Sequence, residues 1–183
     1  MASNATIFKA SVQISDMNRQ YYEDHVLTLA RHPSETEERM MVRLLAFVLH
    51  AHETLSFGRG LSTEEEPALW QKDLTGAIEH WIEVGQPEEK AIRRACGRAT
   101  LVSIYTYGGR GADQWWEKNM TAFGRLNNLV VMNLPLDGSR ALGTLAQPSM
   151  QLQCTIQEGQ IWMTDGENTA HIELTTLKNA STP

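Results

Sequence analysis

The sequence of 183 residues contains only two cysteines and no apolar run long enough for a transmembrane helix, which needs roughly 18 or more apolar residues. The first residues also lack the charged and apolar regions of a secretory signal. Neither Cys96 nor Cys154 has a neighbouring Cys or His ligand pattern, so we expect two buried thiols without a disulfide or a zinc site. Together these absences predict a cytoplasmic protein with no membrane contact.

Positive charge is also scarce. The chain has 16 Lys and Arg against 22 Asp and Glu, which gives a formal net charge of -6 at pH 7. This balance argues against a broad basic surface for nucleic acid, although it leaves room for a local basic groove. No glycine-rich sequence matches a phosphate-binding loop or a dinucleotide fingerprint, so ATP and NAD have no support in the sequence.

Alternating polar and apolar residues begin the chain. Residues 6–14 and 21–29 alternate as half-buried strands do, and the polar residues between them predict a hairpin. Ser34 stands three residues before Glu37, which is the spacing of a capping box and predicts the start of a helix. Residues 40–49 of that helix are apolar around most of its circumference, so we expect the helix to be buried.

The middle of the chain alternates strand patterns with helix patterns. Strands are predicted at residues 77–84, 101–107 and 126–134, with helices at 87–99 and 110–122 between them. This order predicts parallel neighbouring strands that are joined by right-handed crossovers.

The flanking segments have different patterns. A short helix is predicted from residue 67 to 71, because proline is favoured in the first turn of a helix. Residues 150–157, 160–164 and 170–176 alternate and are separated by Glu-Gly and Asp-Gly turns, which predicts an antiparallel meander. The length suits one core, so we expect residues 1–183 to form a single domain of the mixed α/β (α+β) class.

Two acidic residues carry the clearest chemical signal. Asp73 precedes a strand-like run by a few residues, and Glu83 stands near the end of that run, ten residues after Asp73. A pair of carboxylates at a sheet edge can hold a hard divalent cation such as Mg²⁺ or Mn²⁺. Lys90 follows in the first turn of the next predicted helix, where it could stabilise developing negative charge. The competing interpretation makes Asp73 a turn former and Lys90 a solvated helix residue.

Several local sequences resemble the YaeQ family of small bacterial proteins, and the resemblance runs nearly end to end. It implies a PD-(D/E)XK restriction-endonuclease-like core, in which a mixed sheet is flanked by helices, together with the antiparallel C-terminal meander. It does not imply a defined activity. The sequences that carry the resemblance are Arg31-His-Pro-Ser-Glu-Thr-Glu-Glu-Arg-Met-Met41, Trp81-Ile-Glu-Val-Gly85 with Pro87, Ile104-Tyr-Thr-Tyr107, and Thr155-Ile-Gln-Glu-Gly-Gln-Ile-Trp162.

The resemblance assigns roles to four residues. Asp73 takes the place of the aspartate of the superfamily motif, and Glu83 takes that of its central acid. Glu37 resembles an extra acidic residue that some members carry on their first helix, although the capping box also explains it. Lys90 is the candidate for the motif lysine, because relocated lysines occur in this superfamily.

The motif lysine is missing from its usual position. It normally stands two residues after the central acid, and Gly85 occupies that position here. Lys90, Arg59 or Lys72 could supply the positive charge instead.

These observations support three hypotheses of function. The first is a metal-dependent nuclease or phosphodiesterase, with Asp73 and Glu83 as ligands of Mg²⁺ or Mn²⁺ and with Lys90 and Glu37 assisting. The alternative is a catalytically inactive nuclease-fold protein that acts as a binding or regulatory module, which the missing lysine and the negative net charge favour. The third is cleavage of a small phosphodiester. Nucleic acid and another protein are the candidate partners, and a monomer is expected.

Overall fold

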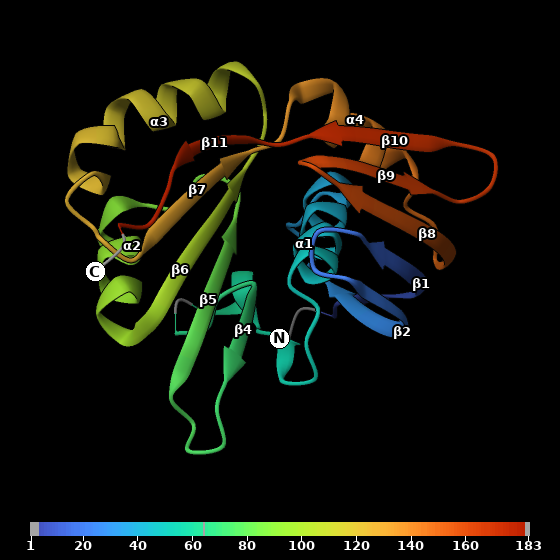
Figure 1. Ribbon diagram of the computed structural model, residues 1–183, viewed down its shortest axis with the longest axis horizontal. Coiled ribbons are helices and arrows are strands. Elements are labelled where there is room, and N and C mark those ends of the chain that lie inside the picture. Colours follow the sequence, from blue (N-terminus) through green and yellow to red (C-terminus); the bar gives the residue numbers. More distant parts are fainter. Residues whose placement is uncertain (1–3, 64, 182–183) are drawn as a thin grey trace. The chain divides into compact units, whose positions relative to one another are not determined.

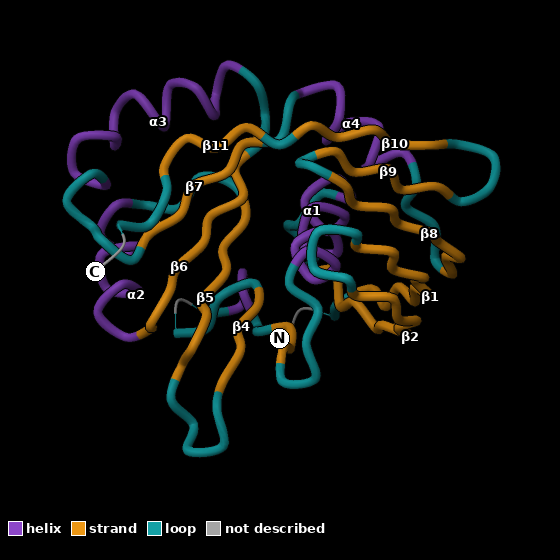
Figure 2. Tube along the Cα trace, in the orientation of Figure 1, coloured by secondary structure: helices purple, strands orange, loops and turns teal. Residues whose placement is uncertain are grey.

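The computed structural model describes residues 4–63 and 65–181, and Figures 1 and 2 show its helices and strands. The chain forms two compact units. Of the described residues, the first contains 4–49 and 135–174, and the second contains 50–63, 65–134 and 175–181. Whether both fold together as the single domain expected from the length stays a prediction. No helix in the described ranges is both long and apolar enough to cross a membrane.

The first unit is a five-stranded mixed sheet with two helices. The sheet order is β10-β9-β8-β1-β2, in which β1 pairs antiparallel to β2 and parallel to β8, while β8, β9 and β10 form the predicted antiparallel meander. The helices α1 and α4 contact each other, and α4 contacts β10. The elements are β1 (Thr6–Asp16), β2 (Tyr21–Arg31), α1 (Glu37–Leu49), α4 (Leu136–Thr144), β8 (Ser149–Gln157), β9 (Gln160–Thr164) and β10 (Thr169–Glu173).

The predicted first hairpin is confirmed, and a side chain closes its turn. Asp16 is 3% exposed, and its Oδ1 accepts the backbone N–H groups of Asn18 and Arg19 at 3.0 and 3.1 Å. Such a bond between an aspartate and the next backbone groups favours a turn over a continued strand. The alternation of the strand then buries Phe8, Ala10, Val12 and Ile14 on one face and leaves the other face to solvent.

The helix α1 is buried as expected, but its cap differs from the prediction. The hydroxyl of Thr36 accepts the backbone N–H of Arg39 at 3.1 Å, and the helix begins at Glu37. The capping box of Ser34 with Glu37 is therefore wrong. Ser34 instead contacts the ring of His32 through its hydroxyl, at 2.6 Å, and through its backbone N–H. Thr36 stands three residues before the N–H that it accepts, which is the usual capping geometry.

The helix α4 had no prediction, because two glycines make its sequence a poor helix former. Both glycines allow close packing within the first unit. A Cβ atom at Gly138 would meet Ile172 Cγ1 at 3.2 Å, and one at Gly143 would meet the Cα of Glu38 at 3.2 Å. The two glycines are therefore explained by the close packing of α4 and do not indicate a loop.

The second unit is a six-stranded mixed sheet with the order β11-β7-β6-β5-β4-β3. The strands β5, β6 and β7 are parallel, as the sequence predicted, and the helices α2 and α3 connect them (Figure 1). Both helices cover one face of this sheet, around a core that includes Trp81, Ile104 and Phe123. The elements are β3 (Leu55–Phe57), β4 (Leu69–Lys72), β5 (Ile78–Val84), α2 (Glu89–Arg98), β6 (Ala99–Thr106), α3 (Arg110–Phe123), β7 (Leu129–Asn133) and β11 (Thr175–Lys178), with a 3-10 turn at Gly60–Ser62.

The predicted helix at residues 67–71 is wrong. Leu69–Lys72 is a strand that pairs antiparallel to β5, with Leu69 opposite Ile82 and Trp70 opposite Trp81. Pairing with a neighbouring strand outweighs the local signal of the proline, as is common for short segments with large apolar side chains. The expected mixed architecture is thus confirmed, but it consists of two mixed sheets.

Both cysteines are free thiols, as expected. Cys154 is buried in the first unit and Cys96 is half-buried in the second. Burial raises the pKa of Cys154 to about 12 and that of Cys96 to about 11, so both thiols are protonated and unreactive at neutral pH.

Candidate functional site

Asp73 lies in the exposed turn between β4 and β5. Its Oδ1 accepts the hydroxyl of Thr75 at 2.6 Å, the backbone N–H of Thr75 at 2.8 Å and the backbone N–H of Ala77 at 3.0 Å. The hydrogen bond from the Thr75 hydroxyl, followed by those from the backbone, lowers the pKa of this carboxyl. The geometry matches the turn-forming interpretation of Asp73.

Glu83 lies at the other end of the same hairpin. Lys72 pairs with Ile78, and Glu83 stands five residues beyond Ile78 along β5, a distance of about 16 Å in an extended strand. The structure therefore does not bring Asp73 and Glu83 together, and they cannot share one cation. The described ranges contain no group of three or more His, Cys, Asp or Glu side chains that could hold a metal ion.

The environment of Glu83 is half-buried and partly apolar. The indole N–H of Trp81, two residues earlier on the same face of β5, donates a hydrogen bond to Oε1 of Glu83 at 3.0 Å. Trp81 itself is 5% exposed and belongs to the core beneath α2 and α3. Glu83 thus combines a carboxylate with a partly apolar setting at the end of a parallel strand, which is a common position for ligand-binding groups.

The position of the missing motif lysine is unsuited to a lysine. Gly85 has a φ of +93°, a conformation that residues with side chains rarely adopt. No neighbouring atom lies within 4 Å of a Cβ built there, so the obstacle is the backbone conformation. A lysine at residue 85 would strain this turn.

The substitutes for that lysine lie in different surroundings. Lys90 is exposed in the first turn of α2. Arg59 is exposed and pairs with Glu66, with 3.7 Å between its Nε and Oε2 of Glu66. The ammonium group of Lys72 stands over the ring of Trp70 at 3.6 Å.

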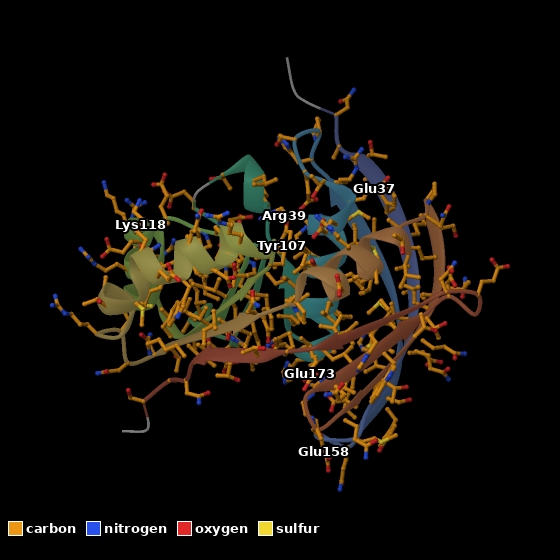
Figure 3. The ribbon with its side chains drawn as sticks, turned by 90° about the horizontal axis from the view of Figure 1, so that it is seen from above. Glu37, Arg39, Tyr107, Lys118, Glu158 and Glu173 are labelled. Atoms are coloured by element: carbon orange, nitrogen blue, oxygen red, sulfur yellow. The ribbon has the colours of Figure 1, made fainter. Side chains whose placement is uncertain are left out.

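Glu37, the fourth predicted site residue, lies in the first unit. It is exposed at the first position of α1 (Figure 3). A negative charge at this position suits the helix dipole, and no contact with another described side chain is needed to explain it.

A charged cluster that the predictions did not include lies just before and within α1. Glu35 is 3% exposed, and its carboxylate receives both Nε and Nη2 of Arg43, at 2.8 and 2.7 Å. Nη1 of Arg39 donates to the same carboxylate. Nη1 of Arg31 donates to the backbone oxygen of Glu35 at 2.7 Å. We call Arg31, Arg39 and Arg43 around Glu35 the guanidinium cluster.

The guanidinium cluster has more positive than negative charge. Its three guanidinium groups carry three positive charges and Glu35 carries one negative charge, which leaves an excess of two. Nε of Arg31 is buried and has no hydrogen-bond partner in the described part of the chain. A spacing of four residues along Arg31, Glu35, Arg39 and Arg43 is the sequence signal that could have revealed the cluster.

The second unit buries a different polar network, on the sheet face opposite the α2 and α3 helices. His80 and the hydroxyl of Ser103 are 2.7 Å apart, and His50 and the hydroxyl of Tyr105 are 2.5 Å apart. The rings of His50 and His80 meet edge to face with centroids 4.7 Å apart. Burial lowers the pKa of His80 to about 4, so this ring is neutral at pH 7.

Two mixed sheets flanked by helices place this chain in the mixed α+β class. The sequence model of the family described as YaeQ protein matches residues 1–174. The chain therefore belongs to the YaeQ family, as the local sequences indicated.

Relatives and solved structures agree over nearly the full length. The chain is 45% identical to an uncharacterized YaeQ protein of Salmonella typhi over 99% of this chain and 100% of that protein. It is 42% identical to the uncharacterized YaeQ protein of Escherichia coli strain K12 over the same shares. The crystal structure of YaeQ from Xanthomonas axonopodis pv. citri matches with a TM-score of 0.92 and 44% identity, covering 97% of this chain and 99% of that one. The YaeQ structure from Pseudomonas syringae matches with a TM-score of 0.91 and 37% identity, covering 96% and 97%.

Proposed function

We propose that this protein is a binding module on a PD-(D/E)XK-like scaffold, and that it binds a phosphate group of its ligand through the guanidinium cluster. The observation that carries the proposal is the excess of positive charge around Glu35, in a chain whose net charge is -6. Arg31 and Arg39 are partly buried, and charge that is partly removed from water is unfavourable when positive groups outnumber their counter-ions. An oxyanion that neutralises it would therefore be bound favourably.

The three arginines of the guanidinium cluster have different roles in this proposal. Arg43 is 6% exposed and forms a two-pronged pair with Glu35, which suits a structural role. The side chain of Arg39 is 14% exposed and uses one of its nitrogens on Glu35. A guanidinium group presents several N–H donors in a fork that matches phosphate oxygens. Arg39 and Arg31 are therefore the residues that would contact the ligand.

The placement of the motif acids favours binding over hydrolysis by an acid pair. Asp73 is held in a hairpin turn about 16 Å along the strand from Glu83, and Gly85 replaces the lysine. The residues therefore do not fit a metal site shared by Asp73 and Glu83. This agrees with the inactive nuclease-fold module that was the alternative hypothesis.

A labelled oligonucleotide tests the proposal by fluorescence anisotropy. Arg39→Gln should weaken binding about tenfold, because hydrogen bonds to charged groups contribute about 1.5–3 kcal/mol, and it should lower the salt dependence. Arg39→Lys keeps the charge but loses the fork, so we expect an intermediate effect. Arg93→Gln removes an equal charge from the exposed surface of α2 and is the matched control. Equal weakening by Arg39→Gln and Arg93→Gln would overturn the proposal, as would the absence of binding to inorganic pyrophosphate and to the oligonucleotide.

A second candidate function is a metal-dependent phosphodiesterase centred on Glu83. The half-buried carboxylate of Glu83, beside Trp81 at the end of β5, favours it. Such a site would use Glu83 without Asp73. Calorimetric titration of Mn²⁺ should then show binding that is lost in Glu83→Gln and retained in Asp73→Asn. Binding retained in both variants would remove this candidate.

A further inference from the structure

The solvent-facing side of the first unit's sheet contains a groove of about 550 Å³. Strands β1, β2, β8 and β9 form its floor and walls, and the turn after β9 forms one end. Alternation along these strands turns most of their apolar residues to the core and most of their polar residues to the groove, and Val26, which is 81% exposed, is an apolar exception in the lining. The polar side chains that line the groove include Ser11, Gln13, Asp24, Gln151, Gln153, Thr164 and Asp165.

One row of side chains crosses the groove from wall to wall. Asp24 on β2 pairs with Gln13 on β1, Gln13 with Gln153 on β8, and Gln153 with Thr164 on β9. Neighbouring strands are about 4.8 Å apart, so the row spans about 14 Å. Asp165 lies in the turn directly after Thr164 and also lines the groove, so a carboxylate lies near each end of the row and amides lie between them.

The charged side chains of the lining are acidic, and the amides of Gln13 and Gln153 between them are free to bind a ligand. The carboxylates of Asp24 and Asp165 line the groove. Among the described residues, no lysine or arginine lines it. The side chains of Asp24, Gln13 and Gln153 are exposed and have no hydrogen-bond or ion-pair partner within the described residues. Oδ1 of Asp165 accepts the N–H groups of Glu167 and Asn168, while its pKa is lowered by the N–H of Asn168 first. Asp165 is therefore ionised at neutral pH.

We propose that this groove binds a linear aliphatic polyamine that lies across the strands. The terminal ammonium groups would meet the carboxylates of Asp24 and Asp165, and the inner ammonium groups would donate to the amide oxygens of Gln13 and Gln153. An ammonium group offers N–H donors only, which matches carboxylate and amide acceptors. The inference is independent of the proposed function, because none of its residues belongs to the guanidinium cluster.

Calorimetric titration with spermine tests the site. Asp24→Asn should weaken binding about three- to fivefold, as expected for the loss of an exposed ion pair, and higher salt should weaken the wild-type complex. Glu173→Gln is the matched control, because Glu173 is exposed on the neighbouring strand β10 and outside the groove (Figure 3). We expect no change in affinity for that variant.

Three results would overturn the inference. The first is the absence of spermine binding to the wild type. The second is equal weakening by Asp24→Asn and Glu173→Gln, which would indicate attraction to the net negative chain as a whole. The third is binding of an uncharged polyether diol of similar length with the affinity of spermine, since a neutral ligand cannot use the carboxylates. Binding of a short polylysine peptide that is sensitive to Asp24→Asn, without binding of spermine, would assign the groove to basic peptides instead.

Discussion

The two units of this protein solve the problem of buried polar groups in opposite ways. The first unit buries ions, because Glu35 and Arg43 are less than a tenth exposed and form a two-pronged pair. The second unit buries neutral groups, because His80 lies beside Ser103 and burial lowers its pKa to about 4. A charge can stay in the interior when a partner of matching geometry is present. A lone base in the same situation loses its proton.

The motif acids and the guanidinium cluster lie in different units. The acids that the motif singles out lie in the second unit, at opposite ends of one hairpin. The arginines that gather around one carboxylate lie in the first unit. We therefore base the proposed ligand site on the excess of positive charge in the guanidinium cluster and not on a pair of acids.

The largest expected effect is the loss of Glu35. Glu35→Ala should reduce the free energy of unfolding by about 3–5 kcal/mol, because it leaves the buried Arg43 without its partner. Chemical denaturation measures this change. Glu37→Ala, which removes an exposed carboxylate two residues further along, is the control and should change stability by less than about 0.5 kcal/mol. Similar losses in the two variants would mean that the buried pair of Glu35 and Arg43 contributes no more to the free energy of unfolding than an exposed carboxylate does.

An effect of intermediate size is expected from His80. Its pKa in the folded protein, about 4, lies below the ordinary value of 6.5. Between pH 6.5 and about 4, His80 is protonated in the unfolded chain and neutral in the folded chain. The free energy of unfolding therefore falls as the pH drops through this range. The loss should total about 3 kcal/mol. Denaturation at several pH values measures it, and His80→Gln should flatten the profile over this window. An unchanged profile in His80→Gln would assign the pH dependence to other groups.

The local patterns predicted elements well where neighbours in sequence are also neighbours in space. The succession β5, α2, β6, α3 and β7 was predicted in order and orientation, because each helix connects adjacent parallel strands. The strand β4 was missed, because its identity depends on pairing with β5. That error concealed the hairpin, and a hairpin that turns near Gly76 necessarily separates Asp73 from Glu83.

The guanidinium cluster was missed for a different reason. Its four-residue spacing begins before the helix, in a segment where the spacing of Ser34 and Glu37 predicts a different cap. Which of the acids Glu35, Glu37 and Glu38 is buried depends on where the helix begins. The shift of the cap from Ser34 to Thr36 is what leaves Glu35 outside the helix, against Arg43.

The smallest expected effect on stability is that of Asp73. Asp73→Ala should lower Tm slightly, because the hydrogen bonds to Thr75 and Ala77 are lost in an exposed turn. Thr75→Ala, which removes the hydroxyl donor alone, should have a smaller effect still. Because the pKa of Asp73 is lowered from 3.8, its contribution is present above that pH and is lost as the pH falls below it. A large loss of stability in Asp73→Ala would show that the turn matters more than its exposure indicates.

The most direct test of the central claim follows a fluorescent oligonucleotide in the presence of Mn²⁺, with its binding and its cleavage measured for the wild type, Asp73→Asn and Glu83→Gln. If the phosphate is bound by the guanidinium cluster and the motif acids do not act as a pair, Asp73→Asn will bind and cleave as the wild type does, whatever the rate of cleavage. Loss of cleavage to the same extent in Asp73→Asn and Glu83→Gln, with folding intact, would contradict this account and restore the paired metal site.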